Sequence, residues 1–116
     1  MSYIKLPLKG TENPLQNYIV CNVDGVYEIE KASTSVIHLY YTSPASAGDD
    51  YLRVSITYDK QSVDGVTADD VANLKALILK VNQQEGNVPM FELLSGDKVQ
   101  VNTSGQGVLA KANNPI

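Results

Sequence analysis

Two segments of alternating polarity, residues 36–42 and 51–58, constrain the fold of this 116-residue chain more than any other feature. Side chains of a β-strand point alternately to opposite faces, so each segment would have one apolar face and one mixed face. The apolar positions are Ile37, Leu39 and Tyr41 in the first segment and Leu52, Val54, Ile56 and Tyr58 in the second. The residues between the segments, SPASAGDD, are polar, which predicts a β-hairpin loop.

The register of this hairpin follows if Thr42 and Tyr51 close the loop. The expected pairs are Tyr41 with Leu52, Leu39 with Val54 and Ile37 with Ile56 on the core face, and Tyr40 with Arg53 and His38 with Ser55 on the other face. The second face would therefore gather the only histidine and the only arginine of the chain beside two tyrosines.

Residues 67–86, TADDVANLKALILKVNQQEG, have the pattern of an amphipathic helix. Thr67 can cap its N-terminus, acidic residues occupy the first turn, and Gly86 follows the last turn. An apolar stripe runs along one side and consists of Val71, Leu74, Leu77, Ile78 and Val81. A single helix with one such stripe is expected to pack against a sheet.

Further strands are predicted at residues 3–8, 18–23 and 26–31. Asp24 and Gly25 separate the last two and are typical of a type I′ hairpin turn, although a bulge or a bend would use the same residues. Residues 88–102 predict a final hairpin. Its inward-facing side chains would be Phe91, Leu93, Val99 and Val101.

These patterns predict an α+β fold, in which a strongly bent antiparallel sheet forms a small β-barrel with one packed helix. Residues 1–102 are expected to form this single domain. Residues 103–116 are rich in Gly, Ala and Asn and predict a flexible C-terminal tail, unless another subunit holds it.

The charge of the chain narrows its possible partners. Nine basic and thirteen acidic residues give a net charge of −4, so nucleic-acid binding would require a local patch or the concave surface of an oligomer.

Cys21 is the only cysteine, which excludes an internal disulfide and indicates a small core residue in a reducing compartment. No segment has the roughly 18 consecutive apolar residues of a membrane span, so no membrane partner is expected.

Motifs of catalysis are missing from the sequence. His38 would have to be the base of a nucleophilic mechanism, but it lies in mid-strand without the glycines of a nucleophile elbow. Glu28 and Glu30 share one side of one strand and are expected to be solvated. Metal-ligand spacing and a phosphate-binding glycine loop are both absent, so we predict a protein that is not an enzyme and holds no cofactor or metal ion.

The candidate contact surface consists of His38, Tyr40, Tyr51 and Arg53. Aromatic rings beside an arginine can stack on nucleic-acid bases. An Arg–Tyr pair can equally stabilise a solvated sheet, and both residue types are enriched in the cores of subunit interfaces. The sequence leaves these three interpretations open.

The run PLQNYIVCNVDGVYEIEKASTSVIHLYYTS, followed by LRVSITYD, a capped helix and a final strand, resembles small uncharacterised proteins of marine phages of the cyanophage type. The resemblance covers most of residues 1–102 and lies in pattern and spacing. It implies an Sm-like small β-barrel, and that fold implies ring-shaped homo-oligomers and binding of RNA or DNA. The chain departs from the Sm pattern in two ways: its helix follows the strands, and only Lys98 stands where the second half of the Sm family has a basic glycine-containing motif. The missing motif weakens the case for a nucleotide-binding pocket.

Two functions follow as expectations. The first is a phage accessory protein in the cytoplasm of an infected bacterial host, where a ring-like homo-oligomer binds RNA or DNA. The second is a structural or decoration protein of the virion that does not bind nucleic acid. The acidity of the chain and its Ala/Gly/Asn-rich end favour the second.

Overall fold

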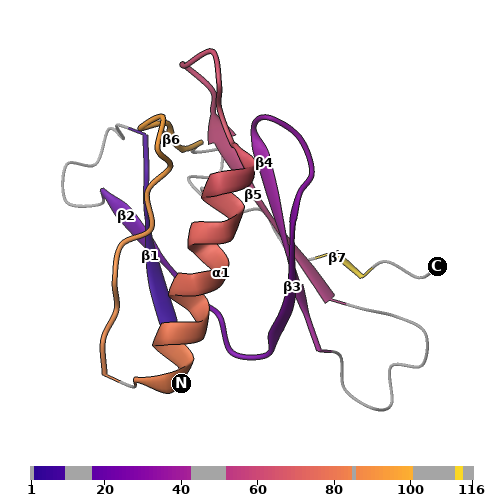
Figure 1. Ribbon diagram of the computed structural model, residues 1–116, viewed down its shortest axis with the longest axis vertical. Helices are drawn as coiled ribbons and strands as arrows, with labels where there is room; N and C mark the ends of the chain where they lie inside the picture. The colour runs from indigo at the N-terminus through magenta and orange to yellow at the C-terminus, as the bar shows by residue number, and fades with distance from the viewer. Residues whose placement is uncertain (1, 10–16, 43–51, 85, 101–111, 114–116) are drawn as a thin grey trace.

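The computed structural model describes residues 2–9, 17–42, 52–84, 86–100 and 112–113, which form an α+β fold of two antiparallel sheets and one helix (Figure 1). The elements are β1 (Tyr3–Pro7), β2 (Tyr18–Asn22), β3 (Val26–Lys31), β4 (Val36–Tyr41), β5 (Leu52–Asp59), α1 (Ala68–Gln83), β6 (Lys98–Val99) and β7 (Ala112–Asn113). The first sheet pairs β1 with β2. The second has the strand order β3-β4-β5-β6, and β7 also pairs with β5.

The β4–β5 hairpin has the register that the alternating pattern predicts. Leu39 pairs with Val54 and Tyr40 with Arg53, and the remaining predicted pairs are also present. Ile37, Leu39 and Ile56 are completely buried, so the predicted core face is confirmed.

Asp24 and Gly25 form a corner between the two sheets rather than the turn of a hairpin. β2 pairs with β1 and β3 pairs with β4, so the predicted type I′ hairpin is wrong and the alternative bend is present. Gly25 has a φ of +76°, which glycine adopts without strain. Its carbonyl oxygen accepts a hydrogen bond of 2.9 Å from the amide of Thr42, which ties the corner to the end of β4.

The helix begins and is capped as the sequence predicts. The Thr67 hydroxyl accepts a hydrogen bond from the Asp70 amide, and the Asp70 carboxylate accepts one from the Thr67 amide, which completes a capping box. Leu74, Ile78 and Val81 of the apolar stripe are buried. Figure 1 shows α1 lying alongside both β1 and β3, and it contacts both strands. The core therefore lies between the helix and the sheets.

The segment after the helix does not form the predicted final hairpin. Met90 forms a parallel bridge to Lys5 of β1, whereas β6 pairs with β5. The burial prediction is confirmed for three of its four side chains, since Phe91, Leu93 and Val99 are buried. The fourth, Val101, lies outside the described residues. Long-range pairing with two earlier strands replaces the local pairing because it completes the core over β1 and β5.

The described strands do not close into a barrel. A parallel bridge between Leu8 and Val99 joins the two sheets at one end, but β2 and β3 do not pair with each other. The α+β class is thus confirmed and the Sm-like barrel is not. Of the predicted tail, residues 112–113 pair with Leu52 and Arg53, and the rest lies outside the described residues. The predicted flexibility of residues 103–116 therefore stays a prediction.

Candidate contact surface on β3, β4 and β5

Three of the four predicted contact residues lie together on the face of the sheet that is opposite the core. Tyr40 and Arg53 are Cα partners across β4 and β5, and His38 lies two residues from Tyr40 on the same face. Tyr51, the fourth, lies outside the described residues. We use the name polar-aromatic face for Tyr27, Glu30, His38, Tyr40 and Arg53, which this side of the sheet brings together.

Glu30 is the centre of the polar-aromatic face, and the sequence did not identify it. Its Oε1 atom lies 3.1 Å from Nδ1 of His38 and accepts a hydrogen bond of 2.9 Å from the Tyr40 hydroxyl. An ionised carboxylate can only accept, so Nδ1 of His38 carries the hydrogen. The prediction of a solvated Glu30 is partly right, because 52% of its side chain is exposed. The sequence placed Glu30 in a predicted strand at residues 26–31. To place Glu30 beside His38 and Tyr40, one must also know that β3 pairs with β4.

A β-bulge in β3 sets this arrangement. The register shifts between Val26 and Glu28, after which Glu28 pairs with Tyr40 and Glu30 with His38. A bulge places an extra residue on one strand and turns the following side chains. Because of that shift, Glu30 is the partner of His38, and its carboxylate lies within reach of both His38 and Tyr40.

The aromatic rings of this face contact one another. The ring centroids of Tyr27 and Tyr40 are 6.5 Å apart, and those of His38 and Tyr40 are 6.1 Å apart in an edge-on arrangement. Tyr27 is 59% exposed, so it presents most of its ring to the surroundings. Large, partly exposed aromatic side chains of this kind supply contact area in interfaces.

The charges of the face are mixed. Hydrogen bonds from Tyr40 and from His38 hold the pKa of the Glu30 carboxyl below its ordinary value. Desolvation and the bond to Glu30 raise the pKa of Tyr40, whereas a hydrogen bond with Arg53 acts in the opposite direction. The Nε atom of Arg53 is buried and has no hydrogen-bond partner among the described residues. A carboxylate at the centre makes this surface unlike a uniformly basic phosphate-binding patch.

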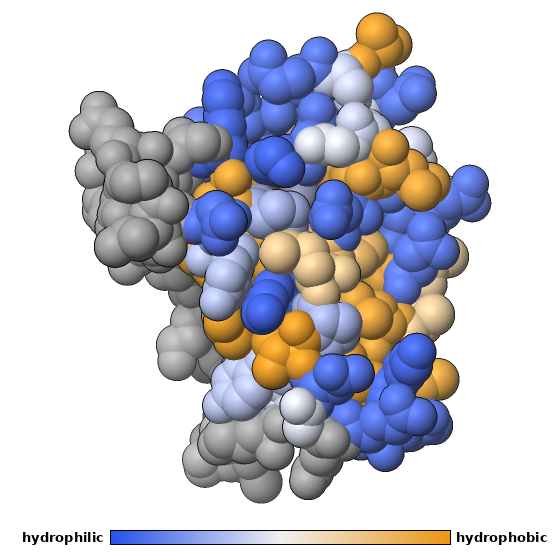
Figure 2. Space-filling model, turned by 90° about the vertical axis from the view of Figure 1, so that its left-hand side faces the viewer, coloured by the Kyte–Doolittle hydropathy of each residue, from blue (hydrophilic) through white to orange (hydrophobic). Residues whose placement is uncertain are grey.

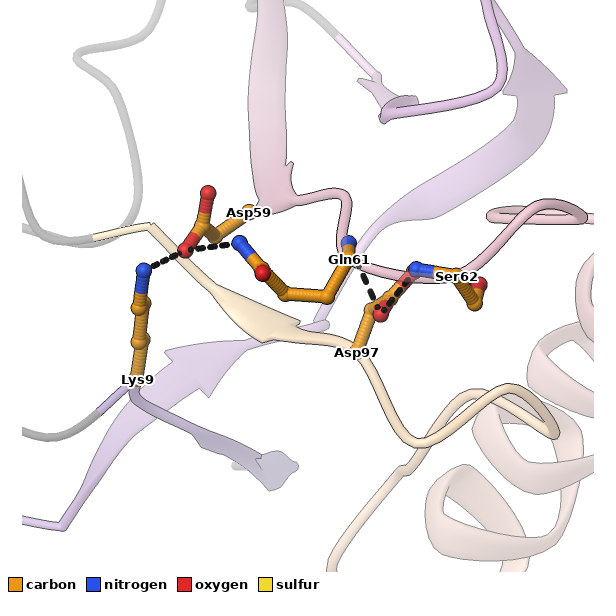
Figure 3. A network of polar contacts seen from close by, with 5 residues as sticks. All are labelled: Lys9, Asp59, Gln61, Ser62 and Asp97. Atoms are coloured by element: carbon orange, nitrogen blue, oxygen red, sulfur yellow. Dashed lines mark hydrogen bonds and ion pairs between the residues drawn. The ribbon is translucent and has the colours of Figure 1, made fainter.

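A second polar network surrounds Asp97 (Figure 3). Its carboxylate accepts hydrogen bonds from the amides of Gln61 and Ser62 at 3.1 and 3.2 Å and from the Ser62 hydroxyl at 2.9 Å. Burial acts to raise the pKa of Asp97, but these bonds outweigh it and the pKa is lowered. Nearby, Lys9 forms an ion pair with Asp59. Asp97 thus holds the loop after β5 against β6, which is a structural role.

A third surface carries exposed apolar side chains and lies on the side of β1 and β2. Tyr18 and Val20 of β2 are exposed, as are Val88 and Met90, and the Lys5 ammonium group lies 4.9 Å from the centroid of the Tyr18 ring. Figure 2 shows hydrophobic side chains on this side of the molecule, interspersed with hydrophilic ones. Exposed apolar patches commonly mark protein contacts, so this surface is a second candidate contact surface beside the polar-aromatic face.

Within the described part of the chain, no group of three or more His, Cys, Asp or Glu side chains could hold a metal ion. No helix in the described ranges is long and apolar enough to cross a membrane. No family model, curated protein or solved structure matches this chain.

Proposed function

We propose that this protein is a non-enzymatic, homo-oligomeric structural protein and that the polar-aromatic face is its subunit contact. The observation that carries the proposal is the sharing of Glu30 Oε1 by His38 and Tyr40 beside the exposed ring of Tyr27. The polar groups are prearranged within the face, and the aromatic rings provide apolar area. Tyr and Arg are enriched in interface cores, where such groups lose contact with water.

The prediction of a virion component belongs to this proposal. A structural protein needs a stable fold and a contact surface, and it needs no catalytic group. The phage origin and the placement in a virion rather than in the host cytoplasm remain predictions from the sequence.

Sedimentation velocity over a range of concentrations tests the subunit contact. The unchanged protein should form oligomers, and Tyr27→Ser should raise the dissociation constant about tenfold, because loss of an interface tyrosine costs roughly 1–2 kcal/mol. The matched variant Tyr18→Ser removes an exposed tyrosine from the β1–β2 side and should leave assembly unchanged. A monomeric protein, or dissociation by Tyr18→Ser alone, would overturn the assignment.

Binding of single-stranded RNA or DNA by a ring is the second candidate. The contacting rings of Tyr27, Tyr40 and His38 favour it, because successive bases can stack on such a row. Closure of the bent sheet into an Sm-like barrel and assembly of a ring belong to this candidate. Glu30 opposes it, since a carboxylate repels phosphate groups.

Glu30→Gln separates the two functions. Removal of the negative charge should strengthen oligonucleotide binding if phosphates approach this face, whereas it should weaken assembly if the face is a subunit contact. Fluorescence anisotropy with labelled oligonucleotides at low salt measures the first effect and sedimentation the second. Phosphate contacts are strongest at low salt, so the absence of binding there would eliminate the nucleic-acid candidate.

A further inference from the structure

The outer edge of β3 is a strand edge without a neighbouring strand among the described residues. β3 pairs only with β4 in that part of the chain. The amide of Ala32 donates to the carbonyl of Val36, so by alternation the backbone groups of Glu30 and Glu28 also face β4. The backbone groups of Ile29 then face away from β4. An edge of this kind can accept another strand.

The side chain of Glu28 occupies the place that a neighbouring strand would take. Its Oε1 atom accepts a hydrogen bond of 3.0 Å from the Ile29 amide and lies 3.7 Å from Nζ of Lys75 on α1. In a complete sheet, the carbonyl oxygen of the next strand accepts that hydrogen bond. Glu28 therefore caps the edge, and Lys75 holds the cap in position.

A groove of about 380 Å³ runs between this edge and α1. Tyr27 and Ile29 contribute to its strand side, and Ile78 and Leu79 to its helix side. Leu79 is 61% exposed, although it lies beside the buried part of the helix. The groove thus combines one row of backbone hydrogen-bonding groups with an apolar wall, as a site for strand addition requires.

The charged side chains of β3 indicate which kind of strand can pair with its outer edge. Glu28 and Glu30 lie on either side of Ile29, and the side chain of each is about half exposed, 55% and 52%. A second copy of β3 in antiparallel pairing about Ile29 would place each of these glutamates opposite a glutamate, which destabilises the pair. A strand with basic side chains on either side of an apolar one would instead match the edge.

We propose that the β3 edge and the groove beside α1 bind an extended, basic peptide segment of a partner protein. The segment adds to β3 as a further strand, its backbone takes the Ile29 amide from Glu28, and its apolar side chain contacts Leu79. Its basic side chains lie opposite Glu28 and Glu30. The site shares Tyr27 and Glu30 with the polar-aromatic face, but the inference does not rest on the oligomer, because the edge of β3 at Ile29 and the groove beside α1 carry it.

A capped pentapeptide of alternating lysine and valine is the probe, with a glutamate and valine peptide of the same length as its counterpart. The basic peptide should bind the full chain in fluorescence anisotropy, and it should shift the amide resonance of Ile29 in NMR spectra. The acidic peptide should not bind. Equal binding of both peptides, or shifts confined to residues remote from β3, would overturn the proposal.

Two pairs of variants complete the test. Leu79→Ser should weaken binding about tenfold through loss of the apolar wall, whereas Leu94→Ser, which changes a leucine of similar exposure away from the groove, should not. Lys75→Ala should strengthen binding several-fold, because it releases Glu28 and removes a positive charge, whereas Lys80→Ala should have little effect. Unchanged affinity for both Leu79→Ser and Lys75→Ala contradicts the site, as does self-association through β3 in place of peptide binding.

Discussion

The hydroxyl group of Tyr40 donates a hydrogen bond of 2.9 Å to Oε1 of Glu30, although the Cα partner of Tyr40 on β3 is Glu28. The tyrosine side chain thus reaches diagonally along the neighbouring strand, a contact that a long side chain can make. His38, the Cα partner of Glu30, approaches the same oxygen atom. Two donors on one acceptor explain why the pKa of the Glu30 carboxyl lies below its ordinary value.

The first prediction concerns the pH dependence of stability through Glu30. Its pKa is lower in the folded state than the unfolded value of about 4.3, so its contribution is complete above that value and is lost as the pH falls through the folded pKa. Glu30→Gln should therefore lower the free energy of unfolding by about 0.5 kcal/mol at pH 7, since the group is half exposed. The difference between the variant and the unchanged protein should therefore be smaller at pH 3 than at pH 7.

Urea unfolding at both pH values measures this difference. Glu92→Gln is the control, because it removes an exposed glutamate from the segment after α1. A constant difference between Glu30→Gln and the unchanged protein from pH 7 to pH 3 would show that the hydrogen bonds to Glu30 do not depend on its charge.

The second prediction concerns Asp70, whose side chain is completely buried. Its carboxylate accepts hydrogen bonds from the amide and the hydroxyl of Thr67 and, at 2.8 Å, from the amide of Leu94. Asp70→Ala should destabilise the protein by about 2 kcal/mol or more, because it removes a cap and leaves buried donors without a partner.

Asp69→Ala is the matched variant in the same helical turn. Asp69 is exposed, so only its interaction with the helix dipole is lost, about 0.5 kcal/mol. Equal losses in thermal unfolding of the two variants would mean that Asp70 acts through the dipole alone and not through Leu94.

The third prediction compares two glycines with positive φ. Gly65 has a φ of +59°, and a Cβ atom added to it would lie 2.2 Å from the carbonyl oxygen of Thr34. Gly86 has a φ of +97°, and a Cβ atom there would meet nothing within 4 Å. Gly65→Ala should cost about 3 kcal/mol or more and Gly86→Ala about 1 kcal/mol, as only the first adds a backbone clash to the strain. Similar midpoints in urea would contradict the close approach at Gly65.

The fourth prediction compares the hydroxyl groups of Tyr58 and Tyr41. The hydroxyl of Tyr58 is buried and has no hydrogen-bond partner in the described part of the chain, whereas that of Tyr41 donates to the Asn22 carbonyl at 2.6 Å. Tyr58→Phe should therefore leave the free energy of unfolding unchanged or raise it by up to about 1 kcal/mol. Tyr41→Phe should lower it by about 1 kcal/mol. A loss in Tyr58→Phe as large as that in Tyr41→Phe would show that the Tyr58 hydroxyl has a partner.

Local patterns in the sequence predicted the β4–β5 hairpin and the capped helix α1, because the pattern of each depends on residues only a few positions apart. The period of two in residues 36–42 and 51–58, with Thr42 and Tyr51 taken to close the loop, predicted the register of β4 and β5 and hence the common face of His38, Tyr40 and Arg53. The cap at Thr67 and the apolar stripe of α1 were likewise predicted, because both depend on residues three or four positions apart.

The prediction failed where one local signal is compatible with several structures. Asp24 and Gly25 suit a hairpin and a corner equally, and the choice between them depended on which strands β2 and β3 could pair with. Residues 88–100 form no hairpin of their own because Met90 and Val99 pair with β1 and β5, far away in the sequence.

The sequence by itself thus determined the β4–β5 hairpin, the capped helix and one face of candidate contact residues, since side-chain periodicity and capping are local properties of the backbone. Only the tertiary structure decided that Glu30 joins that face, that Glu28 caps the edge of β3, and that Asp70 holds the segment after the helix. Each of these contacts depends on a bulge, a strand edge or a pairing between distant segments. Such features arise from packing of the whole chain and leave no periodic pattern in the sequence.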